Sequence, residues 1–228
     1  MLQNLDYSRL QIEPLLSNHL PRFASFTCGD ADLDSFLKDD SLRLHEAHLS
    51  FTYVAIYRIS EDHSETVGYI SLSTDALTLD GDQGEKDGLP EIGFRVVPAL
   101  KIGRLAVSES ARGRIRGLGM ALMGAAWIRG VDLASSIALR FLTVDAYPTA
   151  VGFYQKLGFT PNLSSIYKGK GRRTLSMRLD LFAPEEPSWL LGGAPSQVPP
   201  EDPPNPSPTE GGGSLDSFFQ EHMGGAES

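Results

Sequence analysis

A short glycine- and arginine-rich stretch lies between an apolar segment and the start of a predicted helix. Its residues of interest are Arg112, Gly113, Arg114, Arg116, Gly117 and Gly119. A turn that leads from a strand into a helix presents unpaired backbone N–H groups, which bind anions. Glycines let the backbone close around phosphate oxygens, and arginine adds fork-shaped charged donors. The stretch therefore favours a diphosphate ligand, and a tight turn on a basic surface is the alternative.

The segments around this turn predict strands and helices in alternation. Strands are expected at 51–57, 67–72, 102–107, 140–145 and 174–181. Helices are expected after Asp30 or Asp32, with an apolar face that includes Phe36, and at 118–138 and 149–157. The stretch 80–88 is rich in Gly and Asp, which predicts a loop. This alternation indicates an α/β (α+β) domain with a mixed central sheet flanked by helices.

Two motifs in this order resemble the GNAT superfamily of acetyl-CoA-dependent N-acetyltransferases. The first is Leu105-Ala-Val107 followed by Arg114-Ile-Arg-Gly117-Leu-Gly119. The second is Phe153-Tyr-Gln-Lys-Leu-Gly-Phe159, after a predicted strand. The resemblance covers roughly residues 10–182. It implies a GNAT fold, an acyltransferase that moves acetyl to an amine, and acetyl-CoA as co-substrate.

The resemblance also implies roles for individual residues. The backbone N–H near Leu105 would polarise the thioester carbonyl, and Tyr154 would be the general acid that protonates the CoA thiolate. The turn is about two residues longer than the family norm, so either Arg112 or Arg114 occupies the family's Gln/Arg position. Tyr147 stands where the family has an Asn. The implied cofactor-binding residues are Leu105, Ala106, Val107, Arg112, Gly113, Arg114, Ile115, Arg116, Gly117, Leu118, Gly119 and Met120.

Two further segments resemble the tRNA-acetylating toxin subgroup of that family. They are Phe26-Thr-Cys-Gly-Asp-Ala-Asp-Leu-Asp-Ser-Phe-Leu37 and Val97-Pro-Ala-Leu-Lys-Ile-Gly-Arg-Leu-Ala-Val107. This resemblance implies the α-amine of aminoacyl-tRNA as acceptor and a small antitoxin protein as partner. Two alternatives stay open. One is an acetyltransferase for a small amine, a protein N-terminus or a lysine, and the other is a degenerate CoA-binding interaction module.

The sequence offers no evident general base. The strand 100–107 holds no carboxylate, which favours an α-amine, with a pKa near 7.7–8.0, over a lysine near 10.4. A carboxylate from residues 1–94, such as Glu91, could act through water. Candidate residues for the acceptor or its RNA, with a solvated basic loop as the alternative, are Arg95, Arg104, Tyr167, Lys168, Lys170, Arg172 and Arg173. His45 and His48 lack further ligands nearby, so no metal site is expected.

Charge and composition divide the chain into three parts. Residues 1–94 hold 6 Lys and Arg against 17 Asp and Glu, residues 95–182 hold 14 against 4, and residues 183–228 hold none against 8. The basic middle part can attract an anionic ligand despite the net charge of −9. We expect the acetyltransferase domain at 1–182 and a disordered Pro- and Gly-rich acidic tail at 183–228, with a candidate short helix at 214–223.

The sequence also bears on disulfide bonds, membrane contact, localisation and assembly. One cysteine excludes an intramolecular disulfide framework, and no apolar run is long enough for a membrane-spanning helix. The first residues lack the pattern of a secretory signal. We therefore expect a cytoplasmic protein without membrane contact, and a homodimer as its candidate assembly.

Overall fold

The computed structural model describes residues 3–80, 83–91, 95–167, 173–183 and 189. A seven-stranded sheet runs through these residues in the order β2-β3-β4-β5-β7-β9-β8, and β1 pairs separately with β6. Neighbouring strands of the large sheet are antiparallel, except that β5 and β7 are parallel. The strands are β1 (Gln3–Asn4), β2 (Leu10–Pro14), β3 (Phe51–Arg58), β4 (Ser64–Thr78), β5 (Val96–Val107), β6 (Ile115–Arg116), β7 (Phe141–Ala146), β8 (Thr160–Pro161) and β9 (Leu175–Asp180).

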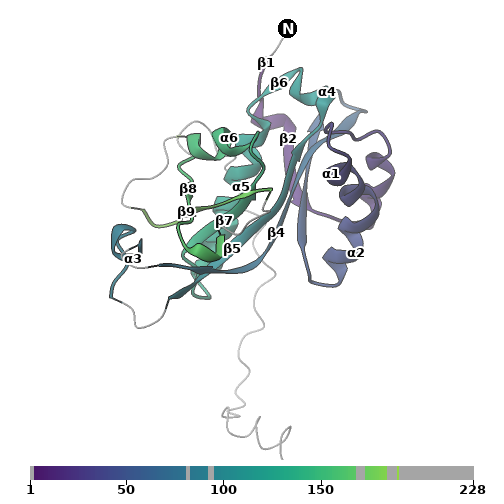
Figure 1. The fold of residues 1–228 in the computed structure, drawn as a ribbon. Helices are drawn as coiled ribbons and strands as arrows, with labels where there is room; N and C mark the ends of the chain where they lie inside the picture. The colour runs from purple at the N-terminus through teal and green to yellow at the C-terminus, as the bar shows by residue number, and fades with distance from the viewer. Residues whose placement is uncertain (1–2, 81–82, 92–94, 168–172, 184–188, 190–228) are drawn as a thin grey trace, which may run out of the picture. The chain divides into compact units, whose positions relative to one another are not determined.

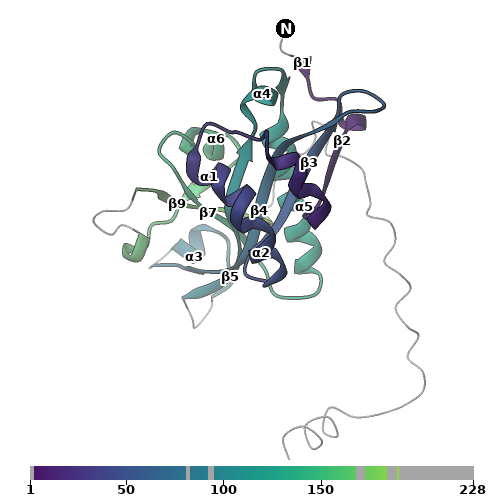
Figure 2. The same cartoon turned by 90° about the vertical axis from the view of Figure 1, so that its right-hand side faces the viewer.

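Helices cover both faces of this sheet (Figure 1). One face packs on α5, and the other packs on α1, α2 and the turns beside them, which lie in front of the sheet in Figure 2. The α-helices are α1 (Ala31–Ser35), α2 (Ser41–Glu46), α3 (Gln83–Lys86), α4 (Glu109–Arg112), α5 (Leu118–Ala134) and α6 (Val151–Lys156). The 3-10 turns are η1 (Tyr7–Arg9), η2 (Ser17–Phe23) and η4 (Ser165–Tyr167), and η3 (Phe36–Asp40) is a π-helical turn.

Side-chain alternation along the strands builds a core on each face. Leu100 and Ile102 of β5 and Val144 of β7 pack toward α5, while Tyr69 and Ala106 pack on Phe36 and its neighbours. Such alternation is expected for strands that are covered on both sides. The predicted α/β fold with a mixed sheet is confirmed.

Several boundaries differ from the sequence prediction. The second hairpin strand extends over Ser64–Thr78, because β5 pairs with it from Val96 to Val107. Helix α5 ends at Ala134, where the Ser135 N–H and hydroxyl both donate to the Asp132 carbonyl. Asp30 caps α1 by accepting hydrogen bonds from two backbone N–H groups.

The predicted loop at 80–88 is wrong in part, because Gln83–Lys86 form the short helix α3. A contact with β9, which is distant in the sequence, explains why these residues form a helix. Arg178 on β9 donates two hydrogen bonds to the Asp87 carboxylate, at 2.8 and 2.9 Å, and a third to the Pro161 carbonyl. Arg178 is 6% exposed. This buried ion pair fixes the segment on the sheet, and local composition carries no signal of it.

We expect Asp87→Asn to lower the free energy of unfolding by about 3 kcal/mol, because it leaves the buried Arg178 charge without its counter-ion. Urea unfolding followed by circular dichroism measures the change. The matched control is Asp40→Asn, which breaks an exposed pair with Arg43 and should cost less than about 0.5 kcal/mol. Equal losses in the two variants would contradict a structural role for the Arg178 pair.

The chain beyond β9 returns to the domain at one described residue. Residues 1–195 form one unit, and 196–228 lie outside the described residues, as does the candidate helix at 214–223. Trp189 packs edge-on against Trp127 of α5, with ring centroids 6.2 Å apart, and its indole N–H donates to the Leu157 carbonyl at 3.0 Å. Trp189 belongs to the stretch that composition assigns to the tail, so the packed part of the chain includes at least one residue of it.

No helix among the described residues is both long and apolar enough to span a membrane.

Candidate active site

A cavity lies in the gap where the two parallel strands separate. β5 and β7 are paired from Ala99 opposite Phe141 to Ile102 opposite Val144, and the pairing stops there. The register between β4 and β5 shifts at the same place, with Gly103 as the extra residue of a bulge, and bulges bend a strand and increase its twist. The two strands then line a cavity of about 630 Å³.

The backbone of β5 offers hydrogen-bonding groups to this gap. The Ser108 N–H, at the end of the strand, donates to the Val67 carbonyl at 2.9 Å and so points toward β4. Successive N–H groups of a strand point to opposite edges, so those of Leu105 and Val107 point away from β4 and into the gap. Leu105, Ala106 and Val107 all line the cavity. Their open edge can pair with an extended amide-containing ligand, as an added strand would.

One end of the cavity is closed by the turn between β5 and α5. Ser108 caps the single-turn helix α4, β6 follows, and α5 begins after Gly117. Gly117 has φ +104°, a backbone conformation that side chains rarely adopt. A Cβ on Gly119 would lie 3.3 Å from the Phe153 ring, so glycine lets α5 approach α6. Since α5 is 17 residues long, its N-terminal N–H groups make an anion site at this end.

The three arginines of the turn point to different places. Arg112 and Arg116 line the cavity, and the Arg112 guanidinium donates to the carbonyls of Cys28 and Val107 at 2.9 and 3.0 Å. Arg114 instead donates to the Glu65 carboxylate at 2.5 Å, on the β4 side. Burial alone would raise the pKa of Glu65, but this hydrogen bond and the Arg114 charge lower it below its usual value. The geometry therefore favours Arg112 over Arg114 as the anion-facing arginine.

The other residues predicted to bind the cofactor also fall into two groups, those that line the cavity and those that do not. Ile115, Leu118 and the two α5-proximal glycines line the cavity, whereas Gly113 and Met120 do not. Gly113 ends α4, and Met120 is 39% exposed on α5. Tyr147, at the family's Asn position, lines the cavity with its side chain 43% exposed.

Tyr154 lies on the cavity wall opposite β5. It projects from α6, is 6% exposed, and packs edge-on against Phe153 and Phe159 at 5.2 and 5.3 Å. Burial raises the pKa of Tyr154 to about 12. The phenol therefore stays protonated at neutral pH, in the form that can donate a proton to a leaving thiolate.

The cavity also holds residues that the sequence did not place there. Cys28, Asp30 and Leu33 reach it from the α1 side, and Asp145 reaches it from β7. Asp145 stands between two buried apolar residues of its strand, Val144 and Ala146, so period-2 alternation was the available signal. Arg104, a predicted acceptor residue, lines the same wall and lies over the Phe36 ring at 4.0 Å.

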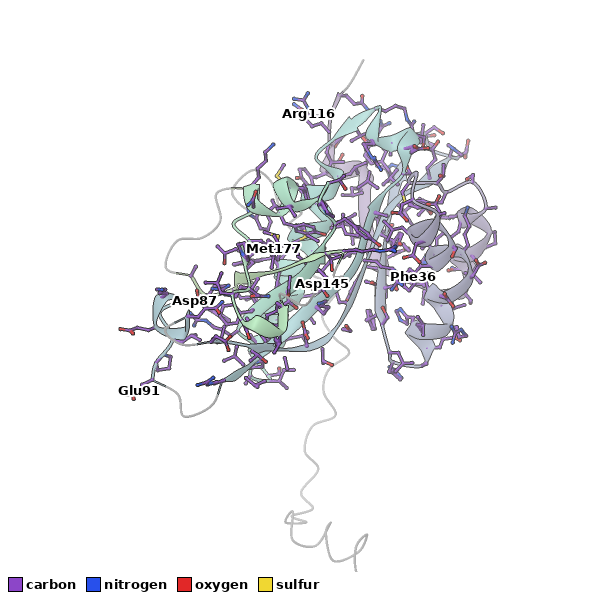
Figure 3. All side chains as sticks on the ribbon, in the orientation of Figure 1. Phe36, Asp87, Glu91, Arg116, Asp145 and Met177 are labelled. Carbon is purple, nitrogen blue, oxygen red and sulfur yellow. The ribbon has the colours of Figure 1, made fainter. Side chains whose placement is uncertain are left out.

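The remaining predicted acceptor residues lie elsewhere. Arg95 and Arg173 are exposed and do not line the cavity, and Lys168, Lys170 and Arg172 lie outside the described residues. Tyr167 is half-buried and packs against a core cluster that includes Leu77 and Phe141, and its hydroxyl accepts a hydrogen bond from the Thr78 N–H at 2.9 Å. Glu91, the example given for a carboxylate from residues 1–94, lies far from Phe36 and Asp145 in Figure 3 and does not line the cavity, so the structure gives no support to Glu91 as a base acting through water.

Cys28 is a buried thiol in the cavity wall. Burial, together with the neighbouring Asp34 carboxylate, raises the pKa of Cys28 to about 11. We expect iodoacetamide to modify Cys28 at pH 8 at least about tenfold more slowly in the folded protein than in denaturing urea, because the thiolate is the reacting form. Mass spectrometry gives both rates from the one cysteine of the chain. Equal rates would identify a reactive thiol and contradict a structural role.

No cluster of three or more potential metal ligands occurs among the described residues. The donors that converge on the cavity are backbone N–H groups, arginines and a phenol, which fit an anionic amide-containing ligand.

Comparison with known protein families identifies the family to which this chain belongs. The family described as "Acetyltransferase (GNAT) domain" matches residues 33–181. The chain therefore belongs to the GNAT acetyltransferase family, and the resemblance of its sequence motifs to that family is confirmed.

Solved structures with the same fold include those of KacT and AtaT. A tyrosine-to-phenylalanine mutant of KacT is 22% identical, with a TM-score of 0.61 over 75% of this chain and 95% of KacT. AtaTR bound with acetyl-CoA is 23% identical, with a TM-score of 0.60 over 76% of this chain and 95% of the other. AtaT complexed with acetyl-methionyl-tRNAfMet is 24% identical, with a TM-score of 0.59 over 73% and 93%. At these identities the likeness shows the fold.

Proposed function

We propose that this protein transfers the acetyl group of acetyl-CoA to a primary amine, and that its acceptor is the α-amine of aminoacyl-tRNA. One observation carries the proposal. The cavity between β5 and β7 brings together an open strand edge, the N-terminus of α5 and the Tyr154 phenol.

The cavity fits acetyl-CoA group by group. The diphosphate lies at the α5 N-terminus, where Gly117 and Gly119 leave room and Arg112 and Arg116 supply positive charge. The pantetheine amides pair with the open edge of β5 near Val107. The Leu105 N–H then points at the thioester carbonyl, where negative charge develops as the amine attacks. This assignment gives roles to cavity-lining residues of the predicted cofactor set and none to Gly113, Arg114 and Met120, which do not line the cavity.

Tyr154 completes the reaction. The acceptor amine forms the new C–N bond and the C–S bond breaks. The Tyr154 hydroxyl gives its proton to the CoA thiolate, and the nitrogen loses one proton, which returns to the Tyr154 oxygen through water. A pKa of about 12 keeps the Tyr154 phenol protonated throughout the neutral pH range.

The choice of acceptor rests on two supports. AtaT, which shares the fold, is known in complex with acetyl-methionyl-tRNAfMet. An α-amine is also partly neutral near pH 7, whereas a lysine side chain is almost fully charged. AtaT has further been seen with the C-terminus of the antitoxin AtaR. On that basis we include a small antitoxin protein among the proposed partners. A cytoplasmic location and a domain at 1–182 remain parts of the proposal from sequence composition alone, with Trp189 packed on the domain beyond that boundary.

Acetyl transfer to charged tRNA tests the proposal. Radiolabelled acetyl-CoA is incubated with the protein and total charged tRNA, with deacylated tRNA, polyamines and peptides in parallel. Label that enters charged tRNA and is absent from deacylated tRNA supports the proposal. Label that enters polyamines or peptides instead overturns the acceptor assignment. The absence of both transfer and calorimetric acetyl-CoA binding overturns the enzyme assignment and favours a degenerate interaction module.

A further inference from the structure

Two charged side chains flank the cavity on the face that looks toward α1. Arg104 lies on β5 and Asp145 on β7, and both line the gap. Their strand neighbours Leu105 and Val144 pack toward the α5 core, so Arg104 and Asp145 share the opposite face. A cofactor that fills the gap would present its acetyl group between them, and an acceptor would arrive from this face.

The Arg104 guanidinium packs against an aromatic ring but forms no ion pair with a carboxylate among the described residues. It lies over the Phe36 ring at 4.0 Å, which fixes its plane. Its Nε is buried and has no hydrogen-bond partner among the described residues, and no carboxylate there forms an ion pair with it within 4.0 Å. A buried donor of this kind costs free energy until an acceptor atom reaches it. Because Arg104 also lines the cavity, its positive charge favours a ligand that brings an oxygen there.

Asp145 is fixed by a neighbouring strand. Its carboxylate accepts a hydrogen bond from the Lys101 ammonium at 2.7 Å, and Lys101 lies 3.9 Å from Asp75. Asp75 in turn accepts a hydrogen bond from the Thr143 hydroxyl. The Asp145 side chain is 36% exposed. Asp145 is therefore held by Lys101 and also borders the cavity, and Figure 3 places it near the middle of the sheet.

We propose that Asp145 binds the ammonium group of the acceptor and takes its proton, and that Arg104 holds the carbonyl oxygen next to that amine. This inference rests on the proposed function, since it assumes that an amine is acetylated in this cavity. It supplies the general base that the sequence did not reveal.

The proton transfers balance as follows. The acceptor ammonium loses one proton to the Asp145 carboxylate, and the neutral nitrogen attacks the thioester carbon. The C–S bond breaks, the thiolate takes the Tyr154 proton, and the new N–H₂⁺ group returns a proton to the Tyr154 oxygen through water. Asp145 then releases its proton to solvent, so each turnover frees one proton, as amine acetylation requires.

The arrangement also predicts which amines are poor acceptors. An α-aminoacyl ester carries an oxygen two bonds from the carbon that bears its amine, within reach of a guanidinium beside it. A polyamine or a lysine side chain offers no such oxygen, and a polyamine places a second cation near Arg104, which like charges disfavour. Selectivity for aminoacyl compounds follows from the pair and not from either residue alone.

The test compares Asp145→Asn with Asp75→Asn, which removes the same charge from the same cluster but does not border the cavity. We measure initial rates with charged tRNA and with an amino acid methyl ester as acceptors, acetyl-CoA affinity by calorimetry, and thermal stability. Asp145→Asn should lower kcat/KM about 30-fold at pH 6.5 and less than about 3-fold at pH 9, where the amine is already neutral. The charged groups that face Asp145 include Lys101 and, behind it, Asp75, while its β9 register partner Ser176 does not titrate.

The outcomes separate the inference from the proposed function. A pH-dependent loss in Asp145→Asn, with unchanged acetyl-CoA affinity and near-normal Asp75→Asn, supports the inference. Equal losses in both variants, or a loss that is the same at every pH, show a structural role and overturn it, although wild-type transfer to charged tRNA would still support the proposed function. If the wild-type protein acetylates neither acceptor, both fall. Arg104→Gln should raise the acceptor KM about tenfold and leave the pH profile unchanged.

Discussion

Replacing Tyr154 by Phe should lower kcat by about 10²- to 10³-fold while acetyl-CoA binds as before. The phenol ring is buried between Phe153 and Phe159, so phenylalanine fills the same space and the cavity keeps its shape. What disappears is the hydroxyl that protonates the thiolate. Single-turnover release of CoA measures the chemical step, and calorimetry measures the affinity.

The matched control for this variant is Tyr57→Phe. Tyr57 is 1% exposed in the same core and does not line the cavity. It should leave kcat within about twofold of the wild type, since it removes a hydroxyl away from the reacting atoms. A Tyr154→Phe protein with normal kcat would mean that water or another group protonates the thiolate, and the role assigned to Tyr154 would be wrong.

Gly117→Ala should weaken acetyl-CoA binding by about 10- to 100-fold. The φ of +104° at Gly117 is unfavourable for any residue with a Cβ, and a left-handed backbone costs about 1–2 kcal/mol there. The Cβ itself meets only Leu5, at 3.7 Å, so the expected loss comes from a change in the backbone where α5 begins and the diphosphate is expected. Calorimetric titration with acetyl-CoA measures the affinity directly.

Gly124→Ala is the control on the same helix. Nothing lies within 4 Å of a Cβ at Gly124, and alanine is the better helix former by about 0.5–1 kcal/mol. It should therefore bind acetyl-CoA normally and unfold at a slightly higher temperature. If both variants bind normally, the diphosphate does not lie at the α5 N-terminus.

Features set by contiguous residues could be predicted from the sequence. The glycine–arginine turn, the helix after it and the Tyr154 helix each depend on spacing within a few residues, and all three are present. Contacts that depend on strand register could not be predicted from the sequence. Lys101 and Asp145 are 44 residues apart and meet because β5 and β7 are parallel neighbours.

The same limit explains the two arginines that the sequence left undecided. Arg112 and Arg114 are alike in composition and neighbourhood, and only the position of Glu65 on β4, 49 residues away, draws Arg114 out of the cavity. The Asp87–Arg178 pair spans 91 residues and turns an apparent loop into α3. Ion pairs between distant segments leave no local pattern from which either placement could be read.

The pairing of β1 with β6 has a practical consequence for making the protein. Gln3 and Leu5 donate backbone hydrogen bonds to Arg114 and Arg116, and Leu5 lies 3.7 Å from where a Gly117 Cβ would be. A purification tag fused ahead of Gln3 would thus emerge beside the cofactor turn and compete with the pairing that steadies it. During synthesis on the ribosome, β1 cannot form its pairing until β6 has been made, more than a hundred residues later.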